Sequence, residues 1–235
     1  MNSMFGYTLP ITLAANQRNN FQLPIDADSD FIVEKIYSVE DGSFRLMIMD
    51  TTSSYQWFSD RVRSENFFGT AEYPNELPTP IVLKRGTQLQ FDVEDLSGAL
   101  NNIELVFEGY RVHADVPMGK TRYFAYIKNF VIPANDRVID TLITNSDTKF
   151  VTSRLIAFRS KDYVTKLKMS MSSLSARQMY SQFTTIENIF GTVLRPNMLK
   201  HPIELDKNSI VKYEVLNTDP AAQTLQLMFD GTKVW

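Results

Sequence analysis

The sequence predicts an all-β protein built from two antiparallel β-sandwich domains in tandem. The first observation is an internal repeat: residues 65–70 read Glu-Asn-Phe-Phe-Gly-Thr, and residues 187–192, 122 positions later, read Glu-Asn-Ile-Phe-Gly-Thr. A repeat of this length indicates two whole domains, because solenoid and propeller units are much shorter. The second observation is a series of short strands, about seven or eight per copy, separated by turn residues, which is typical of jelly-roll-like sandwiches. No strand-helix-strand rhythm supports an α/β fold.

The repeat also sets the expected domain boundaries. At the offset of 122, Pro80 aligns with Pro202, whereas residues 15–16 align with residues 134–135 at an offset of 119. Three residues were therefore inserted in one copy, or lost from the other, between the early strands and the Phe-Gly segment. We predict a first sandwich over residues 1–112, a linker over residues 113–121 and a second sandwich over residues 122–235.

In the first copy, a polar turn at residues 26–30 precedes an apolar run at residues 31–39, which indicates a buried strand. Asp41-Gly42 is a hairpin signal before the next strand. Strict alternation follows in two later stretches, with apolar side chains at Leu89, Phe91 and Val93 and then at Ile103, Leu105 and Phe107. These stretches are expected to be half-buried antiparallel strands.

The second copy repeats this plan. Gly109 and Gly231 follow the last Phe of each copy, where a bulge or a close backbone contact is expected. Residues 175–183 contain enough helix formers to predict a short helix. Trp235 directly follows a strand, so we expect an ordered C-terminus that is available to dock on a partner.

Composition narrows the function classes. The net charge is -3, with basic and acidic residues scattered along the chain, which gives no basic stripe for nucleic acid. The absence of Cys excludes disulfides and thiolate metal sites. The N-terminal residues have no basic segment followed by an apolar run, and no window approaches the roughly 18 apolar residues of a membrane span. We expect a soluble protein, made in a cytoplasm, with no nucleic-acid or membrane partner.

Few residues are candidates for catalysis. The two histidines, His113 and His201, fall at the linker and before a Pro, and the repeat supplies no second histidine at either place. No Gly-x-Ser-x-Gly elbow or phosphate-binding glycine loop occurs. Glu104 and Glu108 share one face of a strand, but Gln226 and Asp230 replace them in the second copy, so the acid pair that a glycosidase needs is not retained. We therefore predict no catalytic residues and no enzyme.

The pattern Asp26-x-Asp28-x-Asp30 resembles the start of a calcium loop. Phe31 stands where that loop needs Gly, and Tyr37 stands where it needs a bidentate Glu. The second copy keeps the turn and loses most of the charge, so a plain turn is the preferred interpretation. No metal and no cofactor are expected.

The segment between residues 51 and 80 is irregular and rich in aromatic side chains. It can pack on its own sandwich or on a neighbouring subunit, and loops with exposed aromatics are frequent at interfaces. The candidate interface residues are Tyr55, Trp57, Phe58, Phe67, Phe68, Met179, Tyr180, Phe183, Ile189, Phe190 and Trp235. Tyr55, Trp57 and Tyr73 are also candidates for a sugar-binding platform, which keeps a carbohydrate-binding module open as an alternative function.

Three stretches of the first copy carry a resemblance to a known group of proteins. They are a Pro-flanked strand at residues 77–87, a strand with a Leu-Ser-Gly-Ala turn at residues 91–99, and a final strand at residues 105–112 that ends in Phe-x-Gly-Tyr-Arg. With the preceding Phe-Gly-Thr, they resemble small bacteriophage virion proteins over most of residues 8–112. The second copy departs from the pattern, because Thr232 replaces the Tyr and residues 217–221 replace the turn.

The resemblance implies a place in the virion and carries no active site with it. It favours an accessory component of the head or neck, such as a decoration, vertex or collar protein. Such a protein would form homo-oligomers and contact other virion proteins, namely the major capsid, portal or neck proteins. The alternative within the same class is the major capsid protein of a tailless phage, because some of these join two jelly rolls in one chain.

Overall fold

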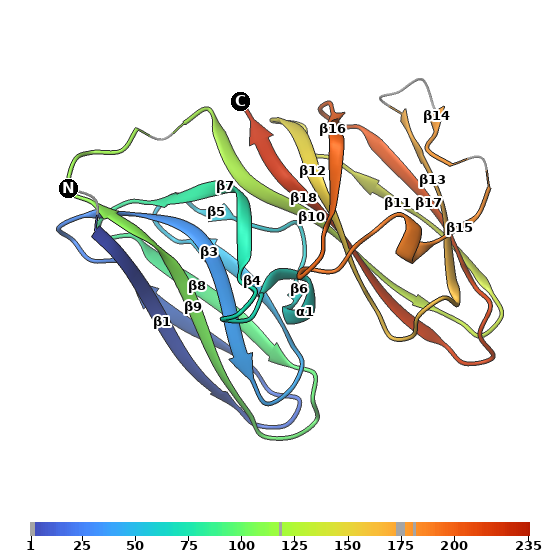
Figure 1. The fold of residues 1–235 in the computed structure, drawn as a ribbon, viewed down its shortest axis with the longest axis horizontal. Helices are drawn as coiled ribbons and strands as arrows, with labels where there is room; N and C mark the ends of the chain where they lie inside the picture. Colours follow the sequence, from blue (N-terminus) through green and yellow to red (C-terminus); the bar gives the residue numbers. More distant parts are fainter. Residues whose placement is uncertain (1–2, 118, 173–176, 181) are drawn as a thin grey trace. The chain divides into compact units, whose positions relative to one another are not determined.

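The computed structural model describes residues 3–117, 119–172, 177–180 and 182–235 (Figure 1). The chain divides into two compact units, Met1–Ala125 and Tyr126–Trp235. The boundary falls within strand β10 (Thr121–Ile132), just beyond the linker predicted at residues 113–121. Both units are built of antiparallel sheets, so the predicted all-β class is confirmed. In the part of the chain that the structure describes, no helix is long and apolar enough to span a membrane.

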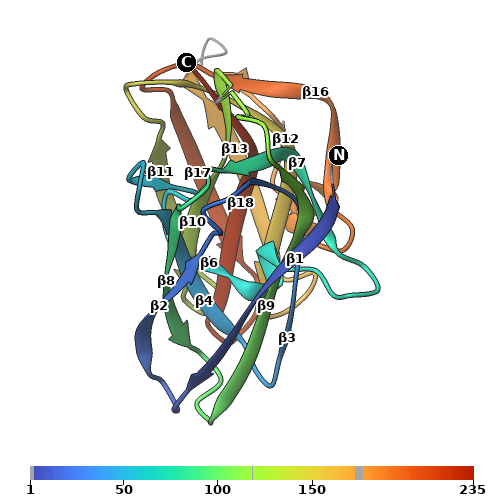
Figure 2. The same ribbon diagram turned by 90° about the vertical axis from the view of Figure 1, so that its left-hand side faces the viewer.

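The first unit contains two facing sheets, visible in Figures 1 and 2. One sheet has the order β1-β9-β3-β7, and the other has the order β2-β8-β4-β5, with β6 also paired to β4. The strand bounds are β1 (Ser3–Leu13), β2 (Arg18–Pro24), β3 (Asp30–Glu40), β4 (Phe44–Asp50), β5 (Tyr55–Gln56), β6 (Val62–Arg63), β7 (Asn75–Leu83), β8 (Gln88–Asp95) and β9 (Asn101–Val112). The helix α1 (Ser64–Phe67) follows β6.

The second unit repeats this order strand for strand. Its sheets are β10-β18-β12-β16 and β11-β17-β13-β14, with β15 also paired to β13. The bounds are β11 (Arg137–Ile143), β12 (Lys149–Arg159), β13 (Thr165–Met171), β14 (Arg177–Gln178), β15 (Thr184–Thr185), η2 (Ile186–Asn188), β16 (Asn197–Leu205), β17 (Ile210–Asn217) and β18 (Gln223–Val234).

The strand pairs of each unit are nested. In the first unit, β1 pairs with β9, β2 with β8, β3 with β7 and β4 with β5, as if one long hairpin had been rolled up. This nesting, divided between two sheets, is the jelly-roll topology. Two jelly rolls in tandem are therefore the architecture of the chain.

The alternating stretches form the core as predicted. Leu89, Phe91 and Val93 of β8 and Ile103, Leu105 and Phe107 of β9 are all buried. Inward side chains of the two sheets meet there, and the rings of Phe91 and Phe107 lie 5.6 Å apart. Alternate residues on both inner faces make up the core of a β-sandwich.

The two predicted close contacts at Gly109 and Gly231 are confirmed. Each Gly lies opposite an irregularity in its partner strand, which falls between Val33 and Lys35 in β3 and between Thr152 and Arg154 in β12. A Cβ atom on Gly109 would lie 1.8 Å from the carbonyl oxygen of Ile32, and one on Gly231 would lie 2.1 Å from that of Val151. Only glycine permits the two backbones to approach this closely.

The repeated Glu-Asn-(Phe/Ile)-Phe-Gly-Thr motif has a similar cause. A Cβ atom on Gly69 would lie 2.2 Å from the carbonyl oxygen of Tyr73, and one on Gly191 would lie 2.1 Å from that of Arg195. Downstream, the side chain of Asn75 donates a hydrogen bond to the carbonyl oxygen of Phe67 at 2.7 Å. Asn197 donates the equivalent bond to Ile189 at 2.6 Å. The motif is therefore a structural turn that fixes the chain before β7 and β16.

The strand pairing locates the three-residue difference between the copies. Phe44 of β4 pairs with Asp95, and Thr165 of β13 pairs with Asn217, so the offset has reached 121 at the fourth strand. Tyr55 and Arg177, which begin the next strands, are separated by the full 122. The second copy is therefore two residues longer than the first between the third and fourth strands, and one residue longer just after the fourth strand.

The short helix predicted over residues 175–183 is wrong where the structure can test it. Residues 175, 176 and 181 lie outside the described residues, but Arg177–Gln178 form β14, which pairs with Ser170 and Met171 of β13. Helix propensity is a weak preference, and backbone pairing with a sheet overrides it.

Candidate interaction surfaces

Six of the predicted interface residues lie in the cores of the two sandwiches. Trp57, Phe58, Phe67, Phe68, Ile189 and Phe190 are all buried. In the first unit, the ring of Phe58 lies 4.7 Å from that of Phe67, and the ring of Trp57 lies 6.2 Å from that of Phe107. The aromatic segment thus packs on its own sandwich, and these six side chains cannot contact a partner while the fold is intact.

The other five predicted residues reach the surface to different extents. Tyr55, Met179, Tyr180 and Phe183 are half-buried, and Trp235 is 51% exposed. The hydroxyl of Tyr55 donates a hydrogen bond to the carbonyl oxygen of Tyr123 at 2.9 Å, and the guanidinium of Arg122 lies 5.1 Å from its ring centre. Tyr55 is therefore held in place within the first unit.

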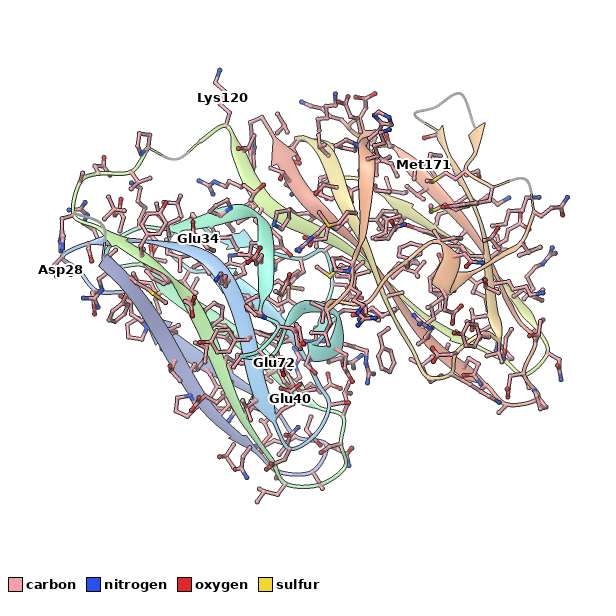
Figure 3. The ribbon with its side chains drawn as sticks, in the orientation of Figure 1. Asp28, Glu34, Glu40, Glu72, Lys120 and Met171 are labelled. Atoms are coloured by element: carbon pink, nitrogen blue, oxygen red, sulfur yellow. The ribbon has the colours of Figure 1, made fainter. Side chains whose placement is uncertain are left out.

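The three aspartates of the calcium-like pattern interact with different partners. Asp26 pairs with Arg111, and Asp28 accepts a hydrogen bond from the hydroxyl of Ser29 at 3.0 Å. Figure 3 shows Asp28, Glu34 and Glu40 well apart in the first unit. Among the described residues, no group of three or more His, Asp and Glu side chains could hold a metal ion.

Asp30, the buried member of this pattern, ties the segment after β9 to the first unit. It accepts hydrogen bonds from the backbone N–H of Val116 at 2.9 Å and of Arg85 at 3.0 Å, and from Lys84 Nζ at 3.0 Å. Lys84 also donates to Asp115 at 2.6 Å. Burial alone would raise the pKa of Asp30, but these bonds outweigh it and hold that pKa well below its usual range.

Residues Tyr123–Ala125, at the start of β10, also belong to the first unit and cover its aromatic segment. The N–H of Ala125 donates to the carbonyl oxygen of Trp57, and the N–H of Ser59 donates to that of Ala125, both at 3.0 Å. Tyr123 is buried, with its ring 6.2 Å from that of Phe67 and 6.4 Å from that of Trp57. We call Tyr123–Ala125 the covering segment.

A pocket of the first unit has Tyr123 of this segment in its lining. It is lined by Asp50, Tyr55 and Trp57, by residues 80–83 of β7, and by Gly119 with residues 121–123. The carboxylate of Asp50 already accepts hydrogen bonds from the N–H of Thr52 at 2.9 Å and the hydroxyl of Ser53 at 2.6 Å. Of the three aromatics considered for sugar binding, Trp57 is buried, Tyr55 is half-buried and Tyr73 is exposed, so the three rings do not form one flat platform.

The two units differ on the outer face of one sheet. In the first unit, this face carries charge pairs, with Asp92 lying 2.7 Å from Arg18 and 2.5 Å from Arg61. In the second unit, Ile139 and Ile143 of β11 and Ile210 of β17 are exposed on it. The repeat aligns these isoleucines with Asn20, Pro24 and Gln88. This face is not among the surfaces predicted from the sequence, although the aligned copies contained the signal.

The remaining titratable candidates lie on the surface of their strands and loops. His113 and His201 are both exposed, and Glu104 is exposed as expected for a solvated face. Glu108 is half-buried and lies 3.7 Å from Lys35.

Comparison with known proteins gives no family. No protein-family model matches the chain, and no curated protein matches it in sequence. Among solved structures, a chain from Sulfolobus turreted icosahedral virus is similar over 97% of this chain and 60% of its own length, with 12% identity and a TM-score of 0.28. Tripeptidyl peptidase 2 is similar over 94% of this chain and 22% of its own length, with 9% identity and a TM-score of 0.29.

A β-porphyranase of glycoside hydrolase family 86 from Bacteroides plebeius is similar over 97% of this chain, with 10% identity and a TM-score of 0.22. The chain spans 35% of the length of that enzyme. Identity and structural overlap are low in all three of these comparisons, so the jelly-roll assignment depends on the strand order itself.

Proposed function

We propose that the chain is a structural component of a bacteriophage virion, an accessory protein of the head or neck that acts through protein–protein contacts. The observation that carries the proposal is the tandem of two complete jelly rolls, a fold used by viral capsid domains. The resemblance of residues 8–112 to small virion proteins supports it. The glycines of that resemblance, Gly69 and Gly109, are required by close backbone contacts.

A non-enzymatic role fits the positions of the ionisable side chains. His113 and His201 are exposed, and the buried Asp30 is occupied by backbone and lysine donors. The partners that we propose are further copies of this chain and other virion proteins. The net charge of -3 gives no reason to add nucleic acid to them.

The same architecture also favours a second candidate, a major capsid protein with two jelly rolls in one chain. Both candidates predict the chain in purified particles, but at different copy numbers. Peptide mass spectrometry of particles from the phage that encodes the chain would measure its copy number against the other shell proteins. We expect fewer copies than the most abundant shell protein. The highest copy number in the particle would favour the major capsid protein, and absence from the particles would overturn both candidates.

Binding of the purified chain to a glycan array would favour the carbohydrate-binding alternative. The Tyr73→Ala variant, which lacks the most exposed of the three candidate rings, gives the background signal on the array. Because Trp57 is buried, we expect the natural chain to bind no glycan above that background.

A further inference from the structure

The covering segment of the first unit has an exact counterpart at the N-terminus of the chain. The N–H of Asp26 donates to the hydroxyl of Tyr7 at 3.0 Å, and the N–H of Asn145 donates to that of Tyr126 at 2.8 Å. This shared contact fixes the offset of 119 between β1 and β10. Residues 4–6 of β1 therefore correspond to Tyr123–Ala125, the covering segment.

The two equivalent segments differ in exposure. Tyr123 is 2% exposed, whereas its counterpart Met4 is 78% exposed, and Gly6, the counterpart of Ala125, is also exposed. Both β1 and β10 are edge strands of their sheets, so one side of each backbone is available for pairing. In β10, Ala125 forms a β-bridge with Phe58.

The surface that the covering segment contacts also recurs in the second unit. The N–H of Trp57 donates to Ile48 at 3.1 Å, and the N–H of Met179 donates to Met169 at 2.9 Å, so Met179 and Tyr180 take the places of Trp57 and Phe58. Trp57 and Phe58 are buried, but Met179 and Tyr180 are only half-buried. Ser181, the counterpart of Ser59, lies outside the described residues.

The neighbouring edge strands, β7 and β16, also differ in the burial of their apolar side chains. Leu77 and Ile81 of β7 are buried in the first unit, whereas their counterparts Leu199 and Ile203 of β16 are half-buried. Met198, in the place of the exposed Glu76, is itself exposed. We call Met179, Tyr180, Leu199 and Ile203 the uncovered surface. Among the described residues, no isolated β-bridge reaches Met179 or Tyr180, whereas Ala125 of the covering segment bridges to Phe58 in the first unit.

We propose that β1 of a second copy of this chain covers this surface, with Met4–Gly6 of that copy pairing alongside Met179–Tyr180. The first unit contains the template for the contact, and the exposed apolar Met4 supplies the side chain that Tyr123 supplies there. Copies then join head to tail, the second unit of one to the first unit of the next. A contact of this heterologous kind closes into a ring or extends as a filament. The proposed contact between copies does not depend on the proposed role in the virion.

Cysteine cross-linking tests this contact directly, because the natural chain has no Cys. Neighbouring strands lie about 4.8 Å apart, within the roughly 4.4–6.8 Å that a disulfide spans between Cα atoms. A Cβ atom added at Gly6 has no neighbour nearer than 3.8 Å, so Gly6→Cys is accommodated. The test mixes the full chain carrying Gly6→Cys with the full chain carrying Tyr180→Cys under mild oxidation.

We expect a disulfide-linked dimer that contains one chain of each variant. The matched control replaces Gly6→Cys by Leu100→Cys, at an exposed turn residue of the same unit, and should give at least tenfold less dimer. A second control places Phe58→Cys and Ala125→Cys in one chain, where the observed bridge should close an intramolecular disulfide. Equal dimer yields from the Gly6 and Leu100 pairs would overturn the proposal.

A second measurement does not depend on the engineered thiols. Met4→Asp places a charge on the exposed side chain that the proposal buries, so the mass-average molecular weight should fall toward one chain at concentrations where the natural chain associates. An unchanged molecular weight for Met4→Asp, or a disulfide within a single chain carrying both Gly6→Cys and Tyr180→Cys, would contradict the second copy as occupant. A chain found in virions that fails these tests would keep its proposed function and lose only this contact.

Discussion

The two units place a charge pair at the same point of the fold but bury it to different extents. Lys35 and Glu108 lie 3.7 Å apart beside the irregularity in β3, and both are partly exposed. Arg154 and Asp230 lie at the equivalent point of β12 and β18, where both side chains are almost fully buried and Arg154 Nε donates to Asp230 at 2.6 Å. The duplication preserved the topology and the glycines that it requires, while the surroundings of matched residues diverged.

The charge pairs should show the largest difference between the units. Removing one partner of a buried pair costs about 3–5 kcal/mol, because the other charge is left buried, whereas an exposed pair contributes roughly 0–1 kcal/mol. Asp230→Asn should therefore destabilise the second unit strongly, and Glu108→Gln should barely change the first. Urea unfolding followed by tryptophan fluorescence measures both, since Trp57 lies in the first unit and Trp235 in the second. Equal losses would show that the burial difference has no energetic effect.

The residues at the covered and uncovered positions give the next comparison. Trp57→Ala should cost the first unit about 3–5 kcal/mol, because it removes a buried ring from a packed cluster. Met179→Ala, at the equivalent half-buried position, should cost less than half as much in dilute solution. The free energies of unfolding, followed by circular dichroism, check both. A larger loss for Met179→Ala would mean that the second unit covers this position by itself.

The turn after β8 should make the first unit sensitive to acid. Burial alone would raise the pKa of Asp95, but hydrogen bonds from Ser97, the N–H of Asn16 and Asn101 hold it well below its usual range. A depressed folded-state pKa gives stability that is present above the unfolded pKa of about 3.9 and is lost as the pH falls below it. Asn217 stands at this position in the second unit and does not titrate.

The Asp95→Asn variant tests this contribution. Its first unit should lose less stability than the natural chain between about pH 7 and pH 3, measured as the shift of the urea midpoint. If the urea midpoint of the variant changed with pH as steeply as that of the natural chain, Asp95 would not contribute to the loss of stability in acid.

A smaller effect is expected from one buried hydroxyl. Tyr213 lies in the core of the second unit, and its hydroxyl has no hydrogen-bond partner among the described residues, whereas Phe91 takes the same place in the first. Because an unsatisfied buried polar group costs about 1–3 kcal/mol, Tyr213→Phe should leave stability unchanged or raise it by up to about 1 kcal/mol. Phe91→Tyr should lower the stability of the first unit. A loss on Tyr213→Phe would contradict an unsatisfied hydroxyl.

The sequence predicted what depends on local pattern. The alternation at Leu89, Phe91 and Val93 follows from the two-residue period of a strand, and Gly109 was recognised because a glycine after a strand is costly unless a close contact requires it. The sequence could not show whether the aromatic segment packs on its own sandwich, because the residues that cover it are distant in the chain. Trp57 and Phe58 are covered by Tyr123–Ala125, which lie more than sixty positions later in the chain.

The pattern of a single strand could not predict two other features, the contacts of the buried Asp30 and the exposed isoleucines of the second unit. Asp30 looks like a calcium ligand beside Asp28, and only its distant donors Lys84 and Val116 show that it ties down the chain. The exposed Ile139 and Ile210 look like ordinary strand residues until they are compared with Asn20 and Gln88 of the first copy.

The absolute mass of the full chain in solution measures directly whether this tandem of jelly rolls builds assemblies through protein–protein contacts. Light scattering behind a sizing column, across a range of concentrations, should show a mass that rises from 27.0 kDa toward a closed oligomer of a few chains. Shell-sized particles would favour the major capsid protein as the function of the chain. A constant 27.0 kDa at every concentration would contradict self-assembly.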